Sequence, residues 1–88
     1  MKIKDFLKES NWTQGQYAKD VHGNGCAVAD AKADRFCLIG AAKMCYPVGM
    51  DAIRCLLDKE LGDIAVSWND EPGRTFVEVR ALVEKLDI

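Results

Sequence analysis

The chain has 88 residues, of which 49% are apolar and 30% are charged, and its formal net charge is −2. A chain this short buries only about 60–65% of the surface that it exposes when unfolded, so we expect one domain, residues 1–88, with a small core. The apolar fraction is too high for a disordered protein, and the slightly negative charge gives no general attraction to nucleic acid or to an anionic membrane.

Two elements are expected before residue 30. Residues 3–9 carry apolar side chains at helical spacing and predict a short helix. Further along, Asn24-Gly25 favours the positive φ angles of a tight turn, so residues 16–21 and 26–29 fit two short strands of a β-hairpin. An irregular loop fits the same glycine-rich segment equally well, and the sequence leaves both alternatives open.

The central helix is expected to run from Asp30, which can cap it, to about Cys45, just ahead of Pro47. Residues 36–42 are apolar on every side of this helix, which predicts that it is buried all round. Gly40 has no side chain, so another segment of backbone could pack closely against the helix there.

A further helix is expected over residues 50–61. Ile53, Leu56 and Leu57 would form its buried side, and Gly62 would supply its left-handed end.

The last third of the chain predicts an extended piece, a polar turn and a final helix. Residues 63–68 alternate weakly and suit a short extended segment. Thr75 and Glu78 form a capping box at the start of the last helix. The predicted fold class is therefore mainly α, with about four helices around the buried central helix at residues 30–45 and the hairpin near residues 16–29 as an open alternative.

No targeting or membrane segment is apparent. The first residues lack the apolar run of an export signal, because Asp5 and Lys8 interrupt them. The longest apolar stretch, residues 36–42, is far short of the roughly 20 residues that span a bilayer. We therefore expect a cytoplasmic protein.

The four cysteines are expected to be reduced and structural. Cys37 lies in the apolar helix and Cys55 stands beside apolar neighbours, which suits small buried side chains. The spacing to Cys26 and Cys45 does not match that of a metal site, and His22 near Cys26 is the one close donor pair. No metal ligand, cofactor or catalytic residue is predicted, and a thiol- or carboxylate-dependent enzyme is the least favoured class.

Two polar segments that contain tryptophan stand out as candidates for binding. Each joins a large aromatic ring to groups that form directed hydrogen bonds, as recognition surfaces do. The candidate residues are Trp12, Gln14 and Tyr17 in the first segment, and Trp68, Asn69, Asp70 and Arg74 in the second. The alternative is structural, since both tryptophans could fill the core and the polar groups could organise a turn.

The chain also resembles a known family. Residues 12–20 read WTQGQYAKD, residues 35–42 read RFCLIGAA, and residues 67–86 read SWNDEPGRTFVEVRALVEKL. They are similar to the pattern WTQGxY, FCxxGA, WNDxPGRTxxEV of a family of small bacterial and phage proteins known only as a domain of unknown function. The resemblance implies a shared fold and no established activity, so it carries over no catalytic residue.

These observations favour a non-enzymatic accessory protein of phage or bacterial mobile-element type. We expect it to bind a macromolecular partner, namely a protein. It would act, for example, as an inhibitor of a host defence system. The alternative is a protein that binds or sequesters a small ligand or nucleotide between the two tryptophan segments. The sequence does not predict the oligomeric state.

Overall fold

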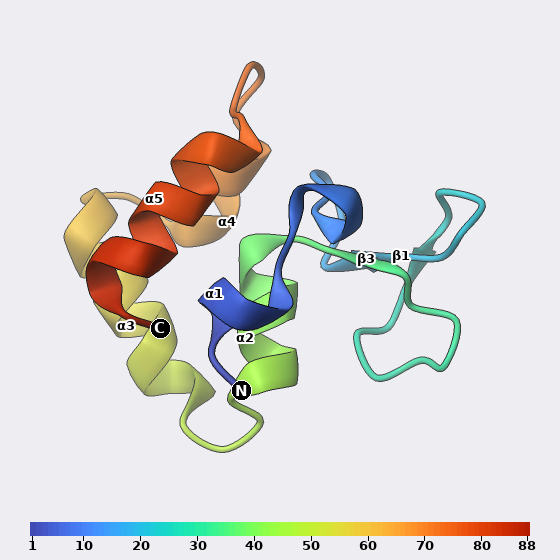
Figure 1. The fold of residues 1–88 in the computed structure, drawn as a ribbon, viewed down its shortest axis with the longest axis horizontal. Helices are drawn as coiled ribbons and strands as arrows, with labels where there is room; N and C mark the ends of the chain where they lie inside the picture. The colour runs from blue at the N-terminus through green and yellow to red at the C-terminus, as the bar shows by residue number, and fades with distance from the viewer.

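The computed structural model describes all 88 residues and shows a helical body with a small three-stranded sheet at one side (Figure 1). In chain order the elements are α1 (Ile3–Phe6), the 3-10 helix η1 (Glu9–Asn11), β1 (Ala18–Lys19), β2 (Gly25–Cys26), β3 (Arg35–Phe36), α2 (Leu38–Cys45), α3 (Met50–Leu61), α4 (Ala65–Asp70) and α5 (Phe76–Leu86). The mainly helical class predicted from the sequence is confirmed. None of the helices has the length and apolar character needed to cross a bilayer.

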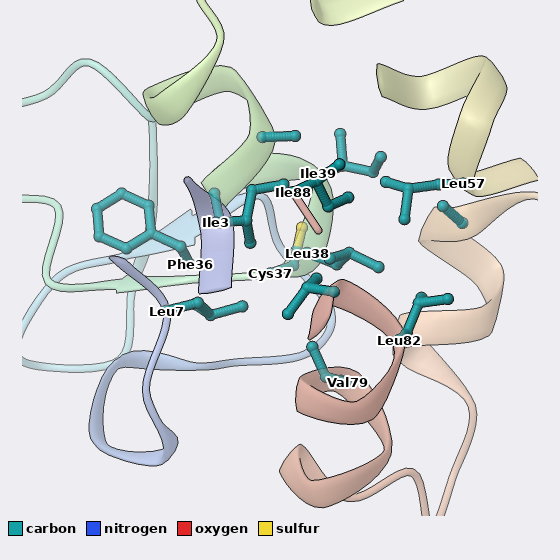
Figure 2. Close-up of a cluster of buried hydrophobic side chains, with 14 of the residues drawn as sticks. Ile3, Leu7, Phe36, Cys37, Leu38, Ile39, Leu57, Val79, Leu82 and Ile88 are labelled. Carbon is teal, nitrogen blue, oxygen red and sulfur yellow. The ribbon is translucent and has the colours of Figure 1, made fainter. Parts of the chain in front are cut away.

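Helix α2 lies in the core, as its apolar sequence predicts. Its residues 38–42 are all buried, and apolar side chains from the other four helices join them in one cluster of 16 buried residues (Figure 2). A core of this size leaves a stability margin of about 3–5 kcal/mol. A single buried contact can therefore decide whether the chain folds.

Helix α2 is shorter than predicted, because it begins at Leu38 and not at Asp30. Cys37 is its N-cap, and the Cys37 Sγ accepts a hydrogen bond from the Gly40 N–H at 3.3 Å. The Asp30 carboxylate instead accepts from the Lys32 N–H at 2.9 Å within a turn. Residues 35–36 are drawn into the sheet as β3, where Phe36 pairs with Ala18, and tertiary pairing overrides the local capping signal.

The hairpin alternative for residues 16–29 is confirmed, with shorter strands than predicted. Its turn is not centred on Asn24-Gly25, because Gly23 is the residue with positive φ (+85°) and Gly25 lies in strand β2. Strands β1 and β2 pair antiparallel, Ala18 with Cys26 and Lys19 with Gly25. A third strand that the sequence did not predict, β3, pairs with β1 on its other side, giving the order β2-β1-β3.

The later helices agree with the sequence except at two places. Helix α3 covers residues 50–61 and ends at Gly62 in the left-handed region, as predicted, but Leu56 is 40% exposed and does not belong to the buried side. The expected extended piece at residues 63–68 is wrong, because residues 65–70 form α4. This helix turns Ala65 and Asn69, one helical turn apart, into the interior.

Helix α1 ends at Phe6, earlier than the predicted residue 9. Leu7 adopts an extended conformation and is only 3% exposed, so the chain leaves the helix in order to bury this side chain. The Asn11 Nδ2 then donates to the Phe6 carbonyl at 3.1 Å and fixes the separate turn that follows.

Ion pairs and hydrogen bonds hold the two ends of the chain together, and we call this contact the clasp. The Lys2 Nζ lies 2.9 Å from Asp87 Oδ1, the Lys4 Nζ donates to the same oxygen, and the Ile3 N–H donates to the Ile88 carbonyl. Tyr46 adds a hydroxyl hydrogen bond of 3.2 Å to that carbonyl. The clasp joins α1 to the end of α5.

The clasp predicts a weak dependence of stability on acid. Hydrogen bonds from Lys4 and Lys2 lower the pKa of Asp87 from 3.8 to about 2. Because the folded state holds this proton less readily than the unfolded state, the contribution is fully present above pH 3.8 and is lost as the pH falls to about 2.

The check is the urea midpoint of the wild type and of Asp87→Asn, measured across that pH range. We expect the variant to be less stable than the wild type at neutral pH and the difference to shrink on acidification. A difference that stays constant with pH would contradict a role for the charged clasp. The carboxyl is well exposed, so the effect is small.

Candidate functional site

Asn69 on α4 joins the two tryptophan segments. Its side chain is fully buried. The Asn69 Oδ1 accepts from Trp12 Nε1 at 2.8 Å and from the Leu38 N–H at 3.1 Å, and its Nδ2 donates to the Thr13 carbonyl at 3.2 Å and to Asp70 Oδ1 at 2.9 Å. These four bonds use the full capacity of the amide and tie the N-terminal segment to α2 and α4.

Gln14 and Asp70 extend this junction toward the surface. The Gln14 Nε2 donates to the carbonyls of Asn69 at 2.8 Å and of Glu71 at 3.0 Å, and so satisfies acceptors that the end of α4 leaves free. Asp70 Oδ1 accepts from the N–H of Gly15 at 2.9 Å. Gly15 has φ +88°, a conformation that side chains disfavour, and this permits the close turn.

Trp68 and Arg74 form a stacked pair beside the junction. The Arg74 guanidinium carbon lies 4.1 Å from the centre of the Trp68 ring, a cation–π distance, and its Nε donates to the Trp68 carbonyl at 2.9 Å. Arg74 also donates to Glu78 Oε2 at 2.6 Å. The predicted capping box of Thr75 with Glu78 is confirmed. The pKa of Glu78 is lowered most by the hydrogen bond from the Thr75 N–H and next by the hydrogen bond from Arg74.

The other two aromatic candidates have different surroundings. The Trp12 ring is half-buried and lies against Phe76, with ring centres 6.2 Å apart. Tyr17 is 42% exposed, and the Lys43 ammonium of α2 lies 4.2 Å from the centre of its ring.

The backbone of Tyr17 approaches α2 very closely. Its carbonyl accepts from the Cys37 N–H at 3.1 Å and passes over Gly40, where an added Cβ would lie only 2.0 Å from the carbonyl oxygen. The close approach of another backbone at Gly40, predicted from the sequence, is therefore confirmed.

Six of the seven predicted residues are brought together, although they lie more than 50 residues apart in the chain. Trp12, Gln14, Asn69 and Asp70 share the hydrogen-bonded junction, and Trp68 with Arg74 continues it. Tyr17 does not join it and contacts α2. The sequence did not reveal the other partners, which are Thr13, Gly15, Leu38 and Glu71, because each contributes only a main-chain atom.

The cysteines are all free, and one of the two predicted settings is wrong. Cys37 is buried, and its burial raises the pKa of the thiol. Cys55 was expected to be buried but is exposed, because it lies on the solvent side of α3. Cys26 and Cys45 are half-buried, and desolvation raises their thiol pKa values too.

No group of three or more metal-ligating side chains comes together in the fold. His22 lies exposed at the tip of the hairpin, where its N–H donates to the Asp20 carboxylate at 2.9 Å.

The fold and the junction define a small, mainly helical protein whose N-terminal segment is bonded to its fourth helix. The chain belongs to a family of unknown function, DUF6197, whose model matches residues 1–86. No curated protein and no solved structure matches the chain significantly.

Proposed function

We propose that this protein is a non-enzymatic accessory protein that binds a macromolecular partner, a protein, through the surface built by its two tryptophan segments. The resemblance to small bacterial and phage proteins supports a cytoplasmic role of the mobile-element type, such as inhibition of a host defence system. The observation that carries the proposal is the direct bonding of the two segments into one rigid unit.

The rigidity of this unit reduces the cost of binding. Five hydrogen bonds join residues 12–15 to residues 69–71, and they fix side chains and backbone that would otherwise lose freedom when a partner binds. Each flexible side chain immobilised on association costs about 0.5–1.5 kcal/mol, so a surface that is ordered beforehand binds more tightly.

The chemistry that this unit presents suits a protein partner. Trp, Tyr and Arg are the residue types enriched at the centres of protein interfaces. Here the Arg74 guanidinium lies over the Trp68 ring, and the exposed turn Glu71–Gly73 projects between α4 and α5 (Figure 1). Because the two segments are in direct contact, they form one surface for a partner, and the turn Glu71–Gly73 protrudes from it.

Arg74→Ala is the variant that tests this proposal. We expect it to weaken binding of the captured partner by about tenfold or more, as truncation of a central interface arginine does. The loss of its ring stacking and hydrogen bonds should lower the free energy of unfolding by only about 1–2 kcal/mol, so the protein stays folded. Partners captured from the native cell are identified by mass spectrometry, and their affinity is then measured by titration calorimetry.

Two further variants complete the comparison. Val77→Ala removes an exposed apolar side chain from the first turn of α5, outside the two tryptophan segments, and should bind like the wild type. Arg74→Lys keeps the charge but loses the planar stack, so it should bind weakly too. If Arg74→Ala, folded as judged by its melting temperature, binds every captured protein as tightly as Val77→Ala does, the proposed surface is wrong.

A further inference from the structure

An exposed Asn24-Gly25 pair lies where the turn of the β1–β2 hairpin enters strand β2. Two hydrogen bonds join the main chain of Asn24 to Asp20. The Asp20 N–H donates to the Asn24 carbonyl at 2.8 Å, and the Asn24 N–H donates to Asp20 Oδ1 at 2.9 Å. The Asn24 side chain is left on the surface.

The Gly25 nitrogen faces away from the rest of the sheet. In an antiparallel ladder, hydrogen-bonded residue pairs alternate with pairs whose N–H and C=O groups point outward. The bond between Asp20 and Asn24 makes that pair a bonded one, so the next pair, Lys19 with Gly25, points outward. Strand β2 is the edge of the sheet, and the Gly25 N–H therefore points to its open side.

We propose that Asn24 is a site of spontaneous deamidation, in which the Gly25 nitrogen attacks the Asn24 side chain. The Gly25 N forms a bond to Asn24 Cγ, the bond from Cγ to Nδ2 breaks, and the amide leaves as ammonia with the proton from Gly25 N. Water then opens the resulting cyclic imide at either carbonyl and gives an aspartate or an isoaspartate. The sum of the steps consumes one water, releases one ammonia and needs no oxidant or reductant.

Three features of the structure favour this position. The attacking nitrogen is free of the ladder, Gly25 has no side chain to hinder the approach, and the amide is exposed. The other two asparagines lack these features. Asn11 is half-buried and precedes the bulky Trp12, and the fully buried Asn69 is held by four hydrogen bonds.

The product would alter the hairpin. Either outcome places a new carboxylate beside the Asp20 carboxylate, and like charges so close repel each other. Isoaspartate also inserts an additional carbon into the main chain, so the two bonds between Asp20 and Asn24 could no longer both close. The proposal goes beyond the binding function and does not depend on it.

The test incubates the full-length folded protein in mildly alkaline buffer and follows each asparagine by peptide mass spectrometry. We expect the peptide with Asn24 to gain the mass of an amide-to-acid conversion and to split into aspartate and isoaspartate forms. Asn69 should react more than about tenfold slower, because even ~1.4 kcal/mol of opening free energy reduces its rate by that factor.

Two variants identify the mechanism. Gly25→Ala should slow the reaction, since the new Cβ hinders the attack, and its contact with the flexible end of Gln16 is readily relieved. Asn24→Gln should leave the hairpin peptide unmodified, because its longer side chain does not form the five-membered imide. If Asn24 stays intact while Asn11 or Asn69 reacts, or if Gly25→Ala reacts as fast as the wild type, the assignment is overturned.

Discussion

Asn69→Ala is expected to lower the free energy of unfolding by at least about 3 kcal/mol, which is most of the margin of so small a core. The substitution leaves the Trp12 indole N–H, the Leu38 N–H and the Thr13 carbonyl without their partner in a buried place. Each unsatisfied buried group costs about 1–3 kcal/mol. Urea unfolding followed by circular dichroism measures the loss.

Asn69→Asp is the matched control, because it keeps the acceptor oxygen and the size of the side chain but loses the donor. It should also be destabilised, since a buried charge is costly and the Thr13 carbonyl and the Asp70 carboxylate would face a second oxygen. The loss should fall as the pH drops and the new carboxyl becomes protonated. An Asn69→Ala protein that loses less than about 1 kcal/mol would show that the junction contributes little to the fold.

Gly40→Ala is expected to destabilise the protein by about 1–3 kcal/mol, the usual cost of forcing an additional methyl group into a packed interior. Its Cβ would lie 2.0 Å from the Tyr17 carbonyl oxygen, and that oxygen is main chain that cannot turn aside as a side chain does. The segment around Tyr17 would have to move away from α2 and lose its bond to the Cys37 N–H.

The sign of the change makes the Gly40→Ala result decisive. In a helix free of such a contact, the same substitution stabilises by about 1 kcal/mol, because alanine is the better helix former. Lys43→Ala, at an exposed position of the same helix, should change stability little apart from the loss of its contact with the Tyr17 ring. Gly40→Ala that is as stable as the wild type, or more so, would contradict the close approach.

Local signals predicted much of the fold correctly. The capping box of Thr75 with Glu78 and the left-handed end at Gly62 depend on residues within a few positions of each other, and both were found where the sequence predicted them. The buried stretch of α2 was equally readable, because no polar side chain interrupts it.

The errors arise where distant residues compete with local signals. Asp30 is a good helix cap by type, but pairing of β3 with β1 keeps residues 35–36 extended, so α2 starts later. Helix α4 has few helix-forming residues. It forms where Asn69 meets Trp12 and Thr13, and contacts across more than 50 residues leave no periodic trace in the sequence.

The candidate site was predictable in its residues but not in its geometry. Residue type alone indicated that both tryptophans and their polar neighbours were candidates for binding. That Asn69 lies wholly inside and joins them could not be predicted, because an asparagine in a polar turn is usually exposed. The junction therefore serves the fold first, and the surface that we propose for binding is built on it.

The most direct test of this account is a double-mutant cycle between Trp12→Phe and Asn69→Ala. The first variant replaces the indole with a smaller phenyl ring that lacks the N–H bonded to Asn69 Oδ1, and the second removes the whole amide. If the two segments form one bonded unit, the double variant should be less destabilised than the sum of the two single variants, by about 1 kcal/mol or more. Effects that add to within about 0.5 kcal/mol would show that the segments are independent and would contradict the account.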